Sequence, residues 1–182
     1  MKLPNTGRKK ALIVVDLQPA FMKPHNSHII PKITALLDNV DYDVYIEAVF
    51  SADKGSLWDI QQDWICPESE DTHTVEGVKE LLASKNPLKV HKHTRSVFRG
   101  DQDVTAFLKK NNIEEVHLVG TETNDCVLAT AFDAFDSGFP VYVLEECCEA
   151  ATQGRHQMGL DILRLQGMTN NRCLANTVEI VV

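Results

Sequence analysis

The stretch that decides the fold is Val116-His117-Leu118-Val119-Gly120-Thr121-Glu122-Thr123-Asn124-Asp125-Cys126-Val127, continued by residues 128–134. Its apolar run predicts a strand that ends at Gly120, and the polar residues that follow predict a tight turn into a helix. With Thr123 or Asn124 as the N-cap, Cys126 lies in the first helical turn. We expect the unpaired N–H groups and the positive dipole end there to favour its thiolate.

That position raises the question of what Cys126 does. A thiol pKa lowered from about 8.5 to about 7 would ionise roughly half of the thiol at neutral pH, which suits a nucleophile. The alternative is a small apolar residue buried under a helix, which is the commoner role of a single cysteine. The other residues of the site must therefore decide between the two roles.

Similar strand and helix patterns alternate along the rest of the chain. Apolar runs predict strands over residues 11–15, 44–50, 88–91, 116–119, 141–144 and 177–182. Helical periods predict helices over residues 29–40, 74–84, 104–110, 124–137 and 154–166, the last with Met158, Ile162 and Leu165 facing inward. Residues 51–72 show no period and suggest a lid or a subunit contact. This alternation predicts a doubly wound, mostly parallel α/β sheet with helices on both faces, in one domain over residues 1–182.

Composition narrows the class of partner. A formal net charge of -8 argues against nucleic acid and anionic membranes, so a small-molecule substrate fits better. The five cysteines are odd in number, which favours reduced thiols in a cytoplasm over a disulfide framework. The first long apolar run, Ala11 to Val15, is too short for a signal-peptide core or a membrane span.

Three ionisable residues follow three of the predicted strands: Asp16, Lys92 and Cys126. The carboxyl ends of parallel strands share one edge of a sheet, where ligands bind. Asp16 suits a general base, Lys92 a cation that stabilises the thiolate, and Cys126 a nucleophile that attacks a carbonyl. Taken singly, Asp16 could also cap a turn and Lys92 could be a solvated lysine. Their joint placement favours a catalytic site.

Three ordered blocks resemble one family. They are Val14-Val15-Asp16-Leu17-Gln18 with Phe21; Lys92, Ser96 and Phe98; and Gly120, Cys126-Val127, Thr130-Ala131, Asp133-Ala134, Gly138, Val141 and Val143. The set, spanning about residues 11–150, is similar to the isochorismatase-like cysteine hydrolase superfamily, which includes nicotinamidases and related amidohydrolases. The resemblance implies a six-stranded parallel sheet in a three-layer α/β/α fold, an Asp-Lys-Cys triad at Asp16, Lys92 and Cys126, and usually a homo-oligomer (dimer or tetramer).

The same resemblance places a cis peptide between Thr121 and Glu122. It would aim the backbone N–H of Glu122, with that of Cys126, into an oxyanion hole. Glu122 departs from many relatives, which carry a small or neutral residue there. Facing the pocket, its carboxylate would repel anionic substrates; facing a helix or a partner, it would be structural.

The residues that would hold a cofactor or a metal are missing from the expected places. Nicotinamidases of this superfamily commonly carry Asp-x-His after the second strand, whereas this chain has Asp53-Lys54-Gly55. His91 and His93 flank Lys92, but two imidazoles without a third ligand make a weak site. No glycine-rich nucleotide motif is present either. We therefore expect no metal and no cofactor.

Substrate contacts are expected from Gln18, Phe21 and the Ser51 to Pro67 loop, with Trp58 or Trp64 as aromatic walls or as core or interface anchors. Together these features predict a cysteine-dependent hydrolase of a small amide, ureido or carbamoyl compound, acting through a thioester. Two alternatives remain open within the fold, a vinyl-ether hydrolase of the isochorismatase type and a non-catalytic binding member. A redox thiol is disfavoured because the chain has no Cys-x-x-Cys motif.

Overall fold

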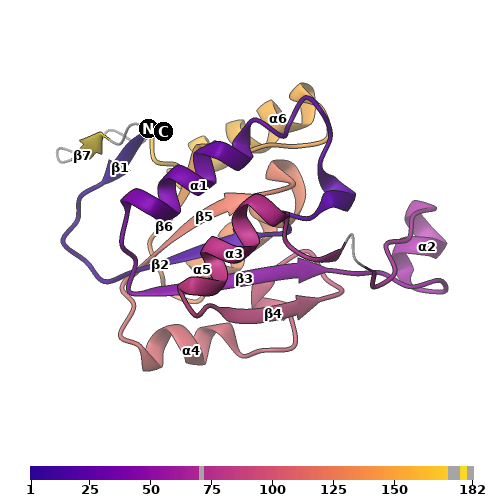
Figure 1. The fold of residues 1–182 in the computed structure, drawn as a ribbon, viewed down its shortest axis with the longest axis horizontal. Helices are drawn as coiled ribbons and strands as arrows, with labels where there is room; N and C mark the ends of the chain where they lie inside the picture. The colour runs from indigo at the N-terminus through magenta and orange to yellow at the C-terminus, as the bar shows by residue number, and fades with distance from the viewer. Residues whose placement is uncertain (70–71, 172–176, 180–182) are drawn as a thin grey trace.

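The computed structural model describes residues 1–69, 72–171 and 177–179. Its main sheet contains five parallel strands in the order β4-β3-β2-β5-β6 (Figure 1). Their bounds are β2 Lys10–Val15, β3 Val44–Phe50, β4 Leu88–Lys92, β5 Glu115–Gly120 and β6 Val141–Cys148. The strand order runs outward from β2 in both directions, so the carboxyl ends of β2 and β5 flank the switch point at which such sheets bind ligands.

Helices cover both faces of this sheet (Figure 1). Alternate residues of β2 point to opposite faces, and both sets are apolar, so each face packs against helices. Leu12 and Val14 pack with α1 (Ile29–Asn39) and α3 (Glu76–Ser84) in one core. Ala11, Ile13 and Val15 pack with α4 (Val104–Lys110) and α5 (Leu128–Asp136) in the other. The sequence prediction of a mostly parallel α/β/α fold is thereby confirmed.

The sheet differs in detail from the expectation. Among the described residues it has five strands instead of six. The predicted closing strand corresponds to β7 (Thr177–Glu179), which pairs antiparallel with β1 (Lys2–Pro4) in a separate two-stranded sheet. The remainder of that predicted strand, residues 180–182, lies outside the described residues. Short pairing with the N-terminal segment, which sequence periodicity cannot reveal, takes β7 away from the main sheet.

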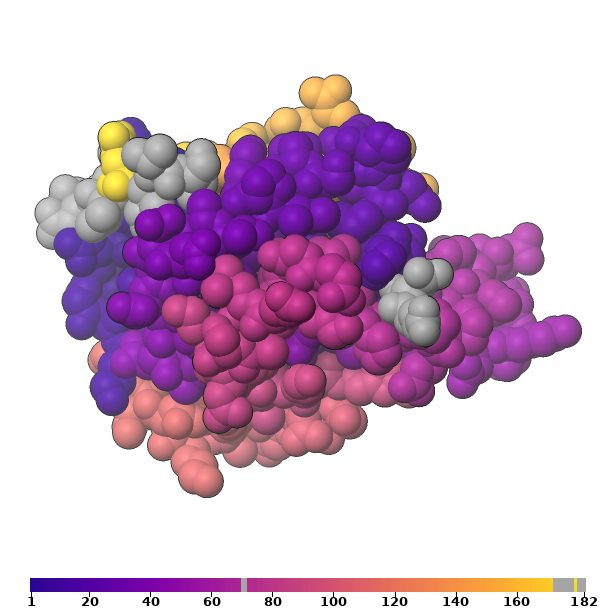
Figure 2. Space-filling view, viewed as in Figure 1, coloured from indigo at the N-terminus to yellow at the C-terminus, as the bar shows by residue number. Residues whose placement is uncertain are grey.

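The region predicted to be irregular contains a helix, α2 (Leu57–Gln62). The Ser56 hydroxyl accepts the backbone N–H of Asp59 at its start, at 3.4 Å. Ala52 and Cys66 exchange backbone hydrogen bonds of 2.7 and 2.8 Å, which close the base of the segment. We call residues 51–66 the α2 arm; it projects from the body of the molecule (Figures 1 and 2).

The predicted inward face of the last helix, α6 (Gln153–Leu165), is wrong. Met158 and Leu165 are 61% and 84% exposed, and Ile162 is also exposed, whereas Gly159, Leu160 and Leu163 are buried. A Cβ on Gly159 would lie 2.8 Å from backbone atoms of Thr123 and Asn124. The close approach of α6 to that turn, possible only with glycine, sets which face is buried.

No helix among the described residues is both long and apolar enough to cross a membrane.

Candidate active site

A buried ion pair lies at the carboxyl ends of β2 and β4. Asp16 follows β2 with φ 47°, and its backbone N–H donates to the Ala48 carbonyl at 3.0 Å. Lys92 Nζ donates to Asp16 Oδ2 at 2.7 Å, and the two side chains are 0% and 1% exposed. Nζ also donates to the Thr94 carbonyl at 3.0 Å. The pair is therefore held in one geometry by backbone contacts on both sides.

The turn that carries Cys126 is wider at its start than the first turn of an α-helix. Residues Thr123–Val127, which we call the nucleophile turn, form a π-helical turn before α5 begins. Glu122 occupies the N-cap position and no side chain caps the turn, so the expectation that Thr123 or Asn124 is the N-cap is wrong. Thr123 is instead engaged elsewhere, since its hydroxyl lies 2.8 Å from His156 Nδ1.

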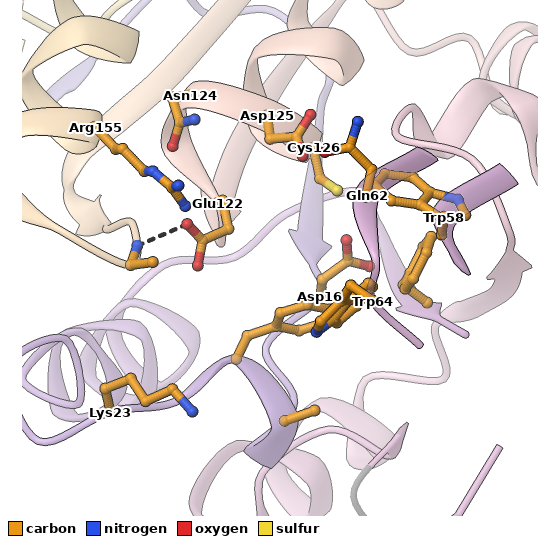
Figure 3. Close-up of a pocket in the computed structure, with 14 residues that line it drawn as sticks. Asp16, Lys23, Trp58, Gln62, Trp64, Glu122, Asn124, Asp125, Cys126 and Arg155 are labelled. Atoms are coloured by element: carbon orange, nitrogen blue, oxygen red, sulfur yellow. Dashed lines mark hydrogen bonds between the residues drawn. The ribbon is translucent and has the colours of Figure 1, made fainter. Parts of the chain in front are cut away.

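The Cys126 thiol points toward the carboxylate of Asp16 (Figure 3). Asp16 Oδ1 is buried and has no hydrogen-bond partner among the described residues, so it is free to accept a proton. Cys126 is itself buried, and its side chain lies close enough to Asp16 and Lys92 to shift the pKa of each. The structure thus brings together the three residues that the sequence singled out.

The protonation states differ from the expectation for the thiol. Burial raises the pKa of Cys126 well above its usual value, and the Asp16 carboxylate raises it further, against the opposing effect of Lys92. Burial also raises the pKa of Asp16, with Lys92 opposing it. Burial lowers the pKa of Lys92, but Asp16 and Cys126 outweigh burial and the net pKa is raised. The resting sulfur therefore keeps its proton, because the free-energy cost of desolvating a thiolate exceeds the stabilisation of the thiolate by the helix end and by Lys92.

The Thr121–Glu122 peptide bond is cis. The Glu122 carboxylate lines the cavity and accepts the backbone N–H of Ala151 at 2.6 Å. Burial raises the pKa of Glu122, whereas the Ala151 hydrogen bond and the charge of Arg155 lower it. The side chain therefore combines the two orientations that we considered, since it faces the pocket and also ties the nucleophile turn to the segment before α6.

A cavity of about 440 Å³ opens above Cys126 and Asp16 (Figure 3). Four aromatic residues form one side of it: Phe21, Phe50, Trp58 and Trp64. The Phe50 and Trp64 rings are stacked, with centroids 5.8 Å apart and planes at 24°. A cavity of this size and lining is typical of small-molecule sites.

The predicted pocket residues fare differently. Phe21 and Trp58 line the cavity, and so does Trp64. Gln18 does not, and its prediction as a pocket residue is wrong. Its amide is buried and fully engaged, donating to the Phe50 and Thr72 carbonyls at 3.0 and 2.9 Å and accepting from the Phe50 N–H at 2.7 Å. Gln18 therefore connects the segment after β2 to the end of β3 and to residue 72.

Several lining residues were missed by sequence reasoning, namely Lys23, Gln62, Asn124, Asp125 and Arg155. Arg155 lies in the first turn of α6, which follows the carboxyl end of β6. The rule that placed Asp16 and Lys92 at this sheet edge could have flagged it. Lys23 lies in an irregular segment, for which the sequence carries no such signal.

One further arginine links the α2 arm to the nucleophile turn. Arg95 pairs with the carboxylate of Asp125, and its guanidinium lies over the Trp58 ring at 4.4 Å from the centroid. The Trp58 indole also donates to the His93 carbonyl at 2.9 Å. These contacts fix the aromatic side of the cavity relative to Cys126.

The side chains near Asp53 do not fit a metal site. Asp53 is exposed, and Gly55 has no side-chain ligand at the position where the sequence resemblance leads us to expect histidine. Ser51 engages both nearby imidazoles, with its hydroxyl 2.9 Å from His91 Nε2 and its carbonyl 2.9 Å from His93 Nδ1. Among the described residues, no group of three or more His, Cys, Asp or Glu side chains could hold a metal ion.

Comparisons with known proteins agree on the family. The model of the isochorismatase domain matches residues 10–171. A Bacillus subtilis (strain 168) protein described as uncharacterized isochorismatase family protein PncA is 27% identical over 176 residues, which cover 84% of this chain and 92% of that protein.

Two solved structures share the fold. An isochorismatase-like hydrolase from Alkaliphilus metalliredigens has a TM-score of 0.76 at 22% identity, covering 88% of this chain and 92% of that one. The nicotinamidase PncA from Bacillus subtilis has a TM-score of 0.74 at 24% identity, covering 88% and 98%. With the family model matching most of its length, this chain belongs to the isochorismatase family of hydrolases.

Proposed function

We propose that the protein is a cysteine amidohydrolase that cleaves a C–N bond in a small amide, ureido or carbamoyl compound. The observation that carries the proposal is the arrangement of Cys126 beside a buried Asp16–Lys92 pair at the base of a cavity. Asp16 keeps one carboxylate oxygen without a partner among the described residues, on the side of the thiol. Related proteins described as nicotinamidase or pyrazinamidase give independent support.

The first half of the reaction forms a thioester. Asp16 takes the thiol proton as the sulfur of Cys126 attacks the carbonyl carbon, which forms the C–S bond and places negative charge on the carbonyl oxygen. The backbone N–H groups of Glu122 and Cys126 stabilise that charge in our scheme, an effect typically worth about 2.7–4 kcal/mol per donor. Asp16 then returns the proton to the nitrogen as the C–N bond breaks, and ammonia or an amine leaves.

The second half regenerates the enzyme. Asp16 takes a proton from water, the oxygen attacks the thioester carbon, and the C–S bond breaks to give a carboxylic acid. The sulfur recovers its proton, so the thiol and the carboxylate end as they began. Lys92 holds Asp16 in place and offsets the negative charge that develops on sulfur. The high thiol pKa suits this scheme, because proton transfer accompanies attack and no resting thiolate is required.

Replacement of Cys126 tests the proposal. Purified wild type should release ammonia from at least one compound in a screen of nicotinamide, ureido and carbamoyl substrates, and mass spectrometry of the quenched reaction should show an acyl group on Cys126. Cys126→Ala should abolish both signals while the unfolding midpoint stays close to that of wild type. Ammonia release by Cys126→Ala at the wild-type rate would refute the mechanism.

The proposal includes a reducing setting and a homo-oligomer. Cys126, Cys147 and Cys148 are free thiols, which supports a cytoplasmic enzyme whose nucleophile must stay reduced. Leu57 and Ile60 on the α2 arm are 74% and 73% exposed, as expected for side chains covered by another subunit. Light scattering after size-exclusion chromatography measures the oligomeric state, and a monomer at micromolar concentration would refute that part.

A further inference from the structure

The cavity has two chemically different sides. Trp58 and Trp64 stand on one side of Cys126, and Lys23 and Arg155 reach in from the other (Figure 3). The reacting sulfur therefore lies between a flat apolar wall and a pair of cations. A ligand that fills the cavity past Cys126 contacts both sides.

The charges around the cavity do not cancel. Its three lining carboxylates each have a partner: Asp16 pairs with Lys92, Asp125 pairs with Arg95, and Glu122 accepts the Ala151 N–H. No ion pair within 4.0 Å and no side-chain hydrogen bond is made by Lys23 or Arg155 with the described residues.

Four cations thus stand against three carboxylates, an excess of one positive charge in a chain of net charge -8. Burial raises the pKa of Glu122, and any protonation of that carboxyl increases the excess. A local positive excess against an acidic background favours a negatively charged ligand.

Asn124 has an acceptor atom without a partner in the described part of the chain. Asn124 Oδ1 is buried and has no hydrogen-bond partner among the described residues. Asn124 lines the same cavity and lies two residues before Cys126. An acceptor that is buried without a donor is costly unless a ligand supplies one.

We propose that the substrate is a small amide or ureido compound that also carries a carboxylate. This inference rests on the proposed function and deepens it. The amide lies at Cys126, the flat part packs against the tryptophans, and the carboxylate lies on the side of the cavity that Lys23 and Arg155 line. The repulsion expected from Glu122 is offset by these two cations, so the substrate charge is accepted.

Two matched pairs of compounds test the charge requirement. One pair is 3-carbamoylbenzoate and benzene-1,3-dicarboxamide, and the other is N-carbamoylglycine and N-carbamoylglycinamide. Within each pair the shapes are similar, and a neutral carboxamide replaces the carboxylate, so the acid product is identified together with the ammonia. Ammonia release should give a kcat/KM at least about tenfold higher for the carboxylate member of at least one pair, as expected for charge-assisted hydrogen bonds. The ratio should fall as salt is added.

Neutral variants locate the effect. The double variant Lys23→Gln/Arg155→Gln should bring the ratio below about 3, because both cations are lost while side-chain size is nearly kept. Lys54→Gln is the matched control: Lys54 is exposed, lies outside the cavity, and its loss should leave the ratio unchanged. An equal or lower kcat/KM for the carboxylate members in wild type would overturn the inference, and so would a preference that survives in the double variant.

A binding measurement separates this inference from the proposed function. The two tryptophans of the chain, Trp58 and Trp64, both line the cavity, so intrinsic fluorescence reports its occupation. Titration of Cys126→Ser with the four compounds should give a Kd at least about tenfold lower for a carboxylate member. A preference in binding without turnover by wild type would support the ligand class and refute the amidohydrolase. Turnover with no preference in either measurement would support the amidohydrolase and refute the ligand class.

Discussion

Replacing Lys92 with Met removes the cation of the buried pair and keeps a side chain of similar length. Lys92 Nζ lies 2.7 Å from Asp16 Oδ2, and both side chains are essentially inaccessible. At an effective dielectric constant of about 20, Coulomb's law gives two such charges an attraction of about 6 kcal/mol. Desolvation of both groups offsets most of this attraction. The single variant leaves the Asp16 carboxylate buried and unpaired, so we expect it to lose about 3–5 kcal/mol of unfolding free energy.

The loss should depend on pH in a definite direction. Burial already raises the pKa of Asp16, with Lys92 opposing it, so removing Lys92 raises that pKa further. A carboxyl whose pKa is higher in the folded than in the unfolded state binds more protons when folded, and stability then falls as pH rises. The deficit of Lys92→Met should therefore be smaller near about pH 4 than near about pH 8.

Urea unfolding followed by circular dichroism measures these differences. Asp16→Asn/Lys92→Met should recover most of the stability, because no unpaired charge remains, while both variants lose amidohydrolase activity by at least about 10³-fold. Lys89→Met, on the exposed side of the same strand, should stay within about 0.5 kcal/mol of wild type. A Lys92→Met protein as stable as wild type, or a double variant no more stable than the single one, would refute the reasoning.

Three further predictions concern the surroundings of the site. Gly159→Ala places a Cβ 2.8 Å from the backbone of the nucleophile turn. It should lower kcat, and it should lower the unfolding free energy by about 1–3 kcal/mol. Gly154→Ala is its control, because a Cβ there meets nothing within 4 Å. Arg95→Gln removes the contact that holds Trp58, and steady-state kinetics should show KM raised by about 5- to 10-fold with a smaller change in kcat; a change confined to kcat would contradict this. Burial lowers the pKa of His117 below its unfolded value, so the unfolded state binds more protons and stability falls as pH drops below about 6.5. In urea unfolding, His117→Asn should therefore lose less stability than wild type between about pH 7 and pH 5. An equal loss in the two proteins would refute the role of His117 in this pH dependence.

Much of the fold could be predicted from the sequence because buried parallel strands leave a strong signal. The continuous apolar runs at Ala11–Val15 and Val116–Val119 are what strands covered on both faces require, and β2 and β5 match them to within one residue at each end. Asp16, Lys92 and Cys126 could be singled out together, because parallel strands end at one edge of a sheet. Their catalytic roles, like the extent of the single domain, stay predictions.

Contacts between segments that lie far apart in the chain could not be predicted from the sequence. Helical periodicity alone placed Met158 and Leu165 inside, but the close approach of Gly159 to the nucleophile turn decided the buried face of α6. Gln18 resembled a pocket residue by its position, whereas its amide group donates hydrogen bonds to carbonyls of β3 and residue 72. Such partners are set by chain segments far apart in sequence, which local patterns do not record.

The stretch from Val116 to Ala134 by itself determined a buried strand, a turn and a helix with a cysteine at its start, because those features depend on the local pattern of apolar, polar and small residues. Only the tertiary structure decided the state and setting of that cysteine. Burial and the nearby Asp16 carboxylate keep the Cys126 thiol protonated, and Arg155 and Lys23 reach the cavity from other segments. Desolvation and charge act through space, so their balance exists only once the chain has folded.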